Sequence, residues 1–409
     1  MSARLRPIAA VAAVGVVALA LAGCVPNPRA TGASTALDVK VADDSCEVSA
    51  STAKSGTVTF TIANTGTDVN EFEILADDKL RIVGEKENIT PGQTVSYVAQ
   101  LNPGTYYTAC KFQQVGQPIG LASFTVSGEE IESDASEKKQ ISAAVTNYVA
   151  YIKSQVGALV PATKAFTDAY RSGDDATARQ LFASTRVAYE RIEPTAEAFG
   201  DLDPKIDYRE VDAVAEGLDW TGFHRIEKDL WPPAAGDKNS DGTDALTDWT
   251  ASTPAERATY ADGLVADVDQ LSKLVGAKDF TVGIADISNG AIGLLDEVAT
   301  GKIEGEEDWW SHTDLTDFAA NVEGAQVAYG IVRDIAKNKG SDGAKLVKTI
   351  DARFTDLETE LAKYGSIEAG FTPYDEVTDS QRKELSDAVN ALGKPLSQLT
   401  HTVLGVKKA

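Results

Sequence analysis

Histidine is scarce in this chain. It has three histidines among 409 residues, and only His224 is followed one helical turn later by a carboxylate, that of Glu227. No second histidine stands four residues after the first, so the chain lacks the HExxH helix of zinc peptidases. Residues i and i+3 share one face of a helix, so this imidazole and this carboxylate can reach one point. A mixed nitrogen and oxygen pair suits a divalent or trivalent cation.

Basic residues are also few. The chain has 38 Lys and Arg against 62 Asp and Glu, which gives a formal net charge of -24. Nucleic-acid binding is excluded, because a DNA or RNA binder usually shows a basic footprint. The acidic excess suits cation binding, and it is equally common in exported proteins that need solubility. The length allows two or three domains.

The N-terminus carries an apolar run that is too short for an ordinary membrane span. Arginines precede this run, which covers residues 8–21 and ends in the sequence LAGC at 21–24. The length is typical of an export signal, and the ending resembles a bacterial lipobox. That resemblance implies cleavage before Cys24 and a diacylglyceryl group on its sulfur, which anchors the protein at the outer face of the cytoplasmic membrane. We expect a signal peptide at 1–23 and a tether at 24–36; the alternative is a plain secretory peptide.

The chain has three cysteines. If Cys24 carries lipid, Cys46 and Cys110 remain outside the cytoplasm. Two thiols in an oxidising compartment pair more often than they stay free.

Alternating apolar and polar residues predict a β domain over 37–127. Turn signals such as Pro91-Gly92 separate short strands, as in a sandwich of about 90 residues. This domain has no histidine, and the only methionine of the chain is Met1. The His, Cys and Met ligands of a blue-copper centre are therefore excluded. The predicted strands cover residues 37–41, 57–62, 72–75, 94–98, 106–108 and 122–126.

A charged break at 128–139 separates this domain from a region of helical periodicity at 140–404. Strand patterns are absent from the second region, which favours helical bundles. The expected fold class is therefore multidomain β + α, a β-sandwich followed by an all-α domain. The predicted helices cover 138–172, 175–193, 208–217, 222–230, 254–275, 281–300, 314–337, 343–363 and 379–404.

Three acidic segments could supply further ligands beside His224. They are YERIEP at 189–194, IDYRE at 206–210 and GEEDWWSH at 305–312. By spacing alone, each segment equally suits a solvated helix end.

These segments, with GFHRIEK at 222–228, resemble the imelysin-type domain of EfeO iron-uptake proteins. The strings around Cys46, at 70–75, at 87–92 and around Cys110 are similar to the cupredoxin-like domain of the same family. The resemblance implies a cupredoxin-like sandwich followed by an imelysin-like helical domain in two bundle-like halves. It also implies an extracytoplasmic iron-binding component whose partners are a membrane iron permease and a haem-dependent peroxidase.

The resemblance also assigns ligands in the helical domain. The HxxE motif of the family falls on His224 and Glu227, and one more ligand is chosen among Glu306, Glu307 and Asp308, with Glu307 preferred. One imidazole among several carboxylates is a hard ligand set, suited to Fe(III), Fe(II), Mn(II) or Zn(II). Crowded carboxylates repel one another, and a tripositive ion relieves more of that repulsion, so we expect iron, bound more tightly as Fe(III). The remaining acidic partners are Glu190, Glu193 and Asp207.

A second metal position is implied in the β domain. Cys46, Glu71 and Cys110 fall on positions proposed as ligands in EfeO proteins, where copper or zinc are candidates. The alternative is a Cys46–Cys110 disulfide that joins two strands.

The acidic stretch at 237–248 resembles a calcium-binding loop, in which alternate residues supply oxygen ligands around a glycine turn. Calcium is therefore a candidate here, and an ordinary acidic loop is the alternative. The candidate ligands are Asp237, Asn239, Asp241 and Asp248.

Two other functions compete with iron binding. One is a metallopeptidase of the imelysin type, which needs an open coordination position and a general base. The sequence offers no independent sign of a base, so we expect no catalytic residue. The other is a surface-binding module in which the metal is structural.

Overall fold

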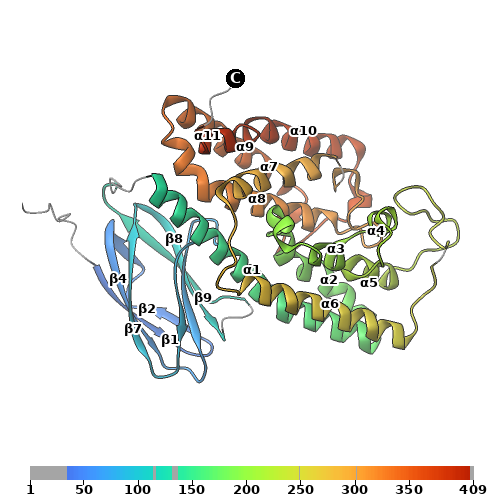
Figure 1. The fold of residues 1–409 in the computed structure, drawn as a ribbon, viewed down its shortest axis with the longest axis horizontal. Coiled ribbons are helices and arrows are strands. Elements are labelled where there is room, and N and C mark those ends of the chain that lie inside the picture. The colour runs from blue at the N-terminus through green and yellow to red at the C-terminus, as the bar shows by residue number, and fades with distance from the viewer. Residues whose placement is uncertain (1–34, 114–116, 131–136, 248, 301, 406–409) are drawn as a thin grey trace, which may run out of the picture.

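The computed structural model describes residues 35–113, 117–130, 137–247, 249–300 and 302–405. Figure 1 shows strands gathered on one side of the molecule and helices on the other. The predicted β + α architecture, a sandwich followed by a helical domain, is confirmed. The predicted signal peptide and Cys24 lie outside the described residues.

The sandwich consists of two sheets with the strand orders β2-β1-β4-β7 and β3-β9-β8-β5-β6. The pairs β1–β4 and β3–β9 are parallel, and the other pairs are antiparallel. The strands are β1 (Thr35–Val41), β2 (Cys46–Val48), β3 (Thr52–Lys54), β4 (Gly56–Asn64), β5 (Asn70–Leu75), β6 (Ile82–Ile89), β7 (Thr94–Leu101), β8 (Gly104–Phe112) and β9 (Ile119–Ser127).

The sandwich interior is apolar and is closed by a disulfide. Phe60 of β4 packs between Phe72 and Phe124, with ring centroids 5.1 and 6.0 Å away. Cys46 and Cys110 form a disulfide with a Cα–Cα distance of 5.6 Å, which joins β2 of one sheet to β8 of the other. Strands β2, β3 and β6 were not predicted; all three lie at sheet edges, where exposure weakens the alternating pattern.

The helical domain has two groups of helices in Figure 1. One group lies around α1 and α6, and the other consists of α7 to α11. The helices of the first group are α1 (Glu137–Ser172), α2 (Asp175–Glu190), α3 (Leu202–Asp207), α4 (Glu210–Glu216), α5 (Gly222–Leu230) and α6 (Pro254–Val275). The second group contains α7 (Ile284–Thr300), α8 (Asp314–Lys337), α9 (Ser341–Leu361), α10 (Asp379–Leu396) and α11 (Leu399–Val403). Short 3-10 turns are η1 (Glu193–Phe199), η2 (Lys302–Glu304) and η3 (Tyr374–Glu376).

Several helix boundaries differ from those predicted. The predicted helix at 175–193 ends at Glu190, and Glu193 begins the turn η1. Helix α3 was not predicted, and a short hairpin, β10 (Gly365–Ser366) and β11 (Gly370–Phe371), lies where no strand was expected. Both exceptions are short, and short elements carry little periodic signal.

Helix α5 is buried over its whole length and packs closely against α3. It begins at Gly222, whose φ of +84° favours glycine. A Cβ at this position would lie 2.2 Å from the carbonyl oxygen of Ile206, so only glycine allows the approach. The polar residues of α5 are therefore carried into the interior, where each needs a partner.

The two domains share a buried contact along α1. Ala150 of this helix packs with Leu75 and Ala109 of the five-stranded sheet. Beside them, Nζ of Lys111 donates to the carbonyl and hydroxyl oxygens of Ser154, at 3.0 and 2.7 Å. The same ammonium lies 3.8 Å from Glu73. Among the described residues, no helix is long and apolar enough to cross a membrane.

Candidate metal centre

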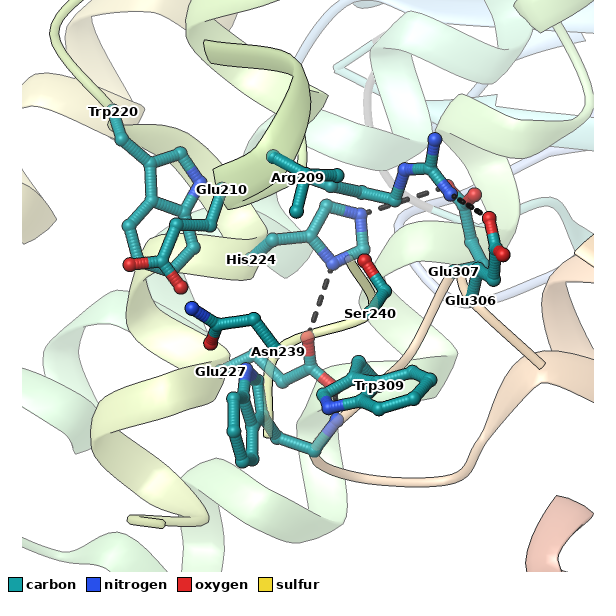
Figure 2. Close-up of a pocket in the computed structure, with 12 residues that line it drawn as sticks. Arg209, Glu210, Trp220, His224, Glu227, Asn239, Ser240, Glu306, Glu307 and Trp309 are labelled. Carbon is teal, nitrogen blue, oxygen red and sulfur yellow. Dashed lines mark hydrogen bonds and ion pairs between the residues drawn. The ribbon is translucent and has the colours of Figure 1, made fainter. Parts of the chain in front are cut away.

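His224 of α5 has two differently engaged ring nitrogens. Its Nδ1 is hydrogen-bonded to Oε2 of Glu227 at 3.1 Å. Its Nε2 is buried without a hydrogen-bond partner and lies 3.6 Å from carboxylate oxygens of both Asp207 and Glu307. Figure 2 shows the ring between Glu227 on one side and Glu307 on the other. A buried nitrogen that faces two carboxylates can carry a proton that pairs with them, or it can bind a cation in place of that proton.

Glu227 is engaged at both of its oxygens. Oε1 accepts hydrogen bonds from the backbone N–H groups of Trp310 and Ser311, at 3.1 and 2.8 Å. Oε2 is bonded to His224, so the carboxylate fixes the orientation of the ring. Metal-binding histidines commonly use their second nitrogen in this way. Glu227 is thus placed to orient His224, whose Nε2 faces the other carboxylates.

The structure brings the six expected ligands of the helical domain into one cluster. The ligand atoms of Asp207, His224 and Glu307 lie within 4.8 Å of one another, and those of Glu190, Glu193 and Asp207 do so as well. A third such group contains His224, Glu227 and Asp308. Glu306, in contrast, pairs with Arg209 at 3.2 Å on a more exposed side.

Sequence reasoning missed the cations inside this cluster. Arg186 is fully buried and forms ion pairs with several carboxylates, and Nζ of Lys302 lies 3.1 Å from Glu190 and 2.8 Å from Glu193. Asn321 donates to the same two glutamates at 2.9 and 2.7 Å. The spacing of Arg186 and Glu190, four residues apart on α2, was an available signal. The carboxylates that Arg186 contacts are Glu190, Asp207, Glu307, Asp308 and Asp317.

Burial gives these groups unusual proton affinities. It raises the pKa of Asp207 to about 6, helped by nearby Glu190 and opposed by Arg186. Burial likewise raises the pKa of Asp314 to about 7 and that of Asp317 well above its usual range. The metal-free cluster therefore holds protons that a cation can replace.

The pKa shifts of His224 and Glu307 both favour the charged form of the side chain. Burial and Arg186 disfavour the imidazolium, yet Glu227, Glu307 and Asp207 outweigh them and raise the pKa of His224 to about 9. Burial also favours the neutral acid at Glu307, but Lys302, His224 and Arg186 hold its pKa well below the usual range. A metal at Nε2 must displace a proton from this ring.

In the described part of the chain, a cleft and a small pocket reach the cluster. A cleft of about 1120 Å³ runs between α3 and α7, and its lining includes Glu193, Asp207, Lys302 and Glu307. The other opening is a pocket of about 20 Å³ beside His224, which holds about one water molecule. The cleft is the wider approach.

Comparison with known proteins assigns the chain to a family. Residues 144–399 match the imelysin family model, and residues 13–119 match that of the cupredoxin-like domain. The chain is 39% identical over 370 residues to the iron uptake system component EfeO of Escherichia coli O157:H7, covering 90% of this chain and 91% of that protein. It is 38% identical, with the same coverage, to EfeO of Yersinia pestis. The chain belongs to the EfeO family. The expected order, a cupredoxin-like domain before an imelysin domain, is confirmed.

The cupredoxin-like domain of this EfeO-family chain does not assemble the expected three-residue metal site. Cys46 and Cys110 are joined in the disulfide, which was the stated alternative. Glu71 is paired with Lys111 across β5 and β8, whereas Phe72 is paired with Cys110. Neighbouring residues of a strand point to opposite faces, so Glu71 and Cys110 face away from each other. Of the two alternatives, the structure therefore has the disulfide, and Glu71 lies on the face of β5 that points away from it.

The acidic loop does not show its oxygens gathered as calcium ligands. Asp237 accepts from the N–H of Ala234 at 2.7 Å, and Asn239 accepts from Lys228 at 3.1 Å. Asp241 accepts from Thr243, at 2.9 Å from its N–H and 2.6 Å from its hydroxyl. The fourth candidate, Asp248, lies outside the described residues.

Residues of this loop line the small pocket. The carbonyl of Lys238 accepts from the indole N–H of Trp309 at 2.8 Å. Asn239 and Ser240 line the pocket beside His224, as Figure 2 shows. Part of the stretch predicted as a calcium loop therefore lines the small pocket beside His224.

Proposed function

We propose that this chain is an iron-binding component of an iron uptake system and captures iron at the centre formed by His224, Asp207 and Glu307. The observation that carries the proposal is the buried Nε2 of His224, which has no hydrogen-bond partner and faces both carboxylates at 3.6 Å. The relatives' name as iron uptake components supports iron as the cargo.

The donor set explains a preference for iron. One imidazole nitrogen and two carboxylates are hard or borderline ligands, suited to Fe(III) and Fe(II), with Mn(II) and Zn(II) as competitors. Despite its burial, Glu190 has a pKa that Lys302 and Arg186 lower, so it adds negative charge behind the first ligands. Fe(III) should bind more tightly than Fe(II), because the higher charge offsets more of the repulsion among the carboxylates.

The envelope location and the partners belong to the same proposal. The LAGC sequence supports lipid attachment at Cys24 and a position at the outer face of the cytoplasmic membrane. Iron captured there is handed to a membrane permease, and a haem-dependent peroxidase handles its oxidation state.

A metallopeptidase is the weaker alternative. A metal-bound water needs a nearby general base. Glu227 has both oxygens engaged, by His224 and by two backbone N–H groups, so it is poorly placed to accept a proton from water. Cleavage of a peptide library by the zinc-loaded protein, lost in Glu227→Gln, would favour the peptidase.

Metal titration tests the proposal. The soluble chain 25–409, purified metal-free, is titrated with Fe(II) without oxygen and with Fe(III) held by a weak chelator. Tryptophan fluorescence is a selective readout, because all five tryptophans lie in the helical domain and bound iron quenches indole emission. The tryptophans are Trp220, Trp231, Trp249, Trp309 and Trp310.

Substitutions distinguish the residue that binds iron, His224, from the residue that orients its ring, Glu227. We expect His224→Ala to abolish saturable iron binding, and the exposed His401→Ala to leave it unchanged. Glu227→Gln should weaken binding by about 10- to 100-fold without abolishing it, because Glu227 acts through the ring. Wild-type affinity in His224→Ala would contradict the proposal.

A further inference from the structure

Lys302 places an ammonium group among the carboxylates of the metal centre. Its Nζ lies 3.0 and 2.8 Å from the two oxygens of Glu193 and 3.1 Å from Oε2 of Glu190. It also lies 3.6 Å from Glu307. The residue is buried, so these contacts are made in a medium where charges interact strongly.

This ammonium occupies a candidate cation position. Glu190, Glu193 and Asp207 form one of the groups whose ligand atoms could hold a metal ion. Lys302 already bonds to two of these three carboxylates, and it supplies a positive charge that a metal would otherwise supply. A metal and this ammonium therefore compete for the same oxygens.

Arg186 is not a comparable competitor. It is fully buried, and its guanidinium lies 5.8 and 5.6 Å from the ring centroids of Phe182 and Phe223. Lys302, in contrast, lines the wide cleft together with Glu193 and Glu307. A lysine has a flexible stem with a compact charge, so its head group can swing into the cleft while its backbone stays in place.

We propose that Lys302 is a displaceable internal counter-ion: its ammonium fills a cation position of the metal-free centre, moves into the cleft when iron enters, and returns as iron leaves. The small pocket beside His224 holds only about one water and is lined by Asn239, Ser240 and Trp309, whereas Lys302 lines the wide cleft, so iron that enters from the cleft meets Lys302 on its way. The inference rests on the proposed function. It explains how a buried acidic centre can release its cargo.

Charge removal at Lys302 tests the competition. We expect Lys302→Met to bind iron at least about 10-fold more tightly than the wild type and to release it correspondingly more slowly to an excess of chelator. Lys302→Arg keeps the charge and should not show this gain. Lys205→Met is the matched control, because it removes an exposed lysine from the helix that ends at Asp207. Affinity and release equal to those of wild type in Lys302→Met would overturn the proposal.

Lysine labelling of the wild-type protein gives a second test that needs no variant. An amine-reactive reagent with peptide mass mapping should modify Lys302 faster in the iron-loaded protein, because the displaced ammonium faces the cleft. Equal or slower labelling would overturn the displacement. A wild-type protein that binds no iron would instead contradict the proposed function, so the two failures are distinguishable.

Discussion

The molecule buries charge in two different ways, one between its domains and one inside the helical domain. At the domain contact, the Lys111 ammonium lies 3.8 Å from Glu73 and donates to Ser154. In the candidate metal centre, seven carboxyl groups contact the cations of Arg186 and Lys302 or the ring of His224. These carboxyl groups belong to Glu190, Glu193, Asp207, Glu227, Glu307, Asp308 and Asp317.

The first is a matched ion pair, whereas the second is a cluster with an excess of carboxyl groups. A matched pair can be replaced by apolar residues at little cost, since its attraction mainly offsets the desolvation of its own members. An excess of buried acid has no such compensation within the protein, and the raised pKa values of Asp207 and Asp314 show part of the cost. Such an excess is useful to a protein that receives a cation.

The largest expected effect on stability comes from replacing Arg186, the cation that is fully buried inside the cluster. Arg186→Met leaves carboxylates such as Glu190 and Asp317 without their counter-ion, and should lower the free energy of unfolding by about 3–5 kcal/mol. Urea unfolding followed by tryptophan fluorescence measures this loss. Arg333→Met, which removes a partly exposed ion pair with Asp351, is the control and should cost about 1 kcal/mol or less. Equal losses in the two variants would contradict the comparison.

The second-largest loss of stability is expected when the disulfide of the sandwich is removed. Replacing both Cys46 and Cys110 by Ala should cost about 2–4 kcal/mol, because the disulfide restricts the unfolded chain. Hydrogen exchange should report the loss in the sandwich strands. Iron affinity should not change, and a large loss of iron binding would place a metal site in the sandwich after all.

Bound iron should stabilise the helical domain, which contains the acidic cluster, and should not stabilise the sandwich. At a free iron concentration of about 100 times Kd, the gain is about 2.7 kcal/mol. Metal and protons compete for Asp207, with a pKa of about 6, and for His224, with a pKa of about 9. The gain should therefore shrink as the pH falls from 7 to 5. Thermal unfolding with and without iron at both values measures it, and a gain that grows at pH 5 would be inconsistent with these ligands.

The smallest effect is expected at the matched pair. The double variant Glu73→Leu with Lys111→Met should change the free energy of unfolding by less than about 1 kcal/mol, because both charges are removed together. The single variant Lys111→Met is the control and should be clearly less stable, since it leaves Glu73 buried without its cation. If the double variant lost as much free energy of unfolding as the single variant, the two charges would not offset each other, and the prediction would be wrong.

Much of the centre could be predicted from the sequence. His224 and Glu227 lie one turn apart on a helix, and this spacing alone brings them together. The acidic partners came from resemblance, and the structure gathers them around the same ring. The fold class followed from the change of period between the two domains.

The remaining features depend on contacts between distant segments. Lys302 meets Glu193 across 109 residues, and Glu227 meets the backbone of Ser311 across 84. No local spacing contains such pairs. The placement of Glu71 has a similar origin, because the register of β5 on β8 decides which face it occupies.

Helix α1 has a further consequence for how the chain can be divided. It is 36 residues long, about 54 Å, and it packs both on the five-stranded sheet and on α2 and α6. A fragment that starts at Glu137 would keep the bundle but leave Ala150 bare of its sheet partners. A polar residue at Ala150 would remove the apolar surface that the sandwich covers, and the candidate iron centre could then be studied apart from the sandwich.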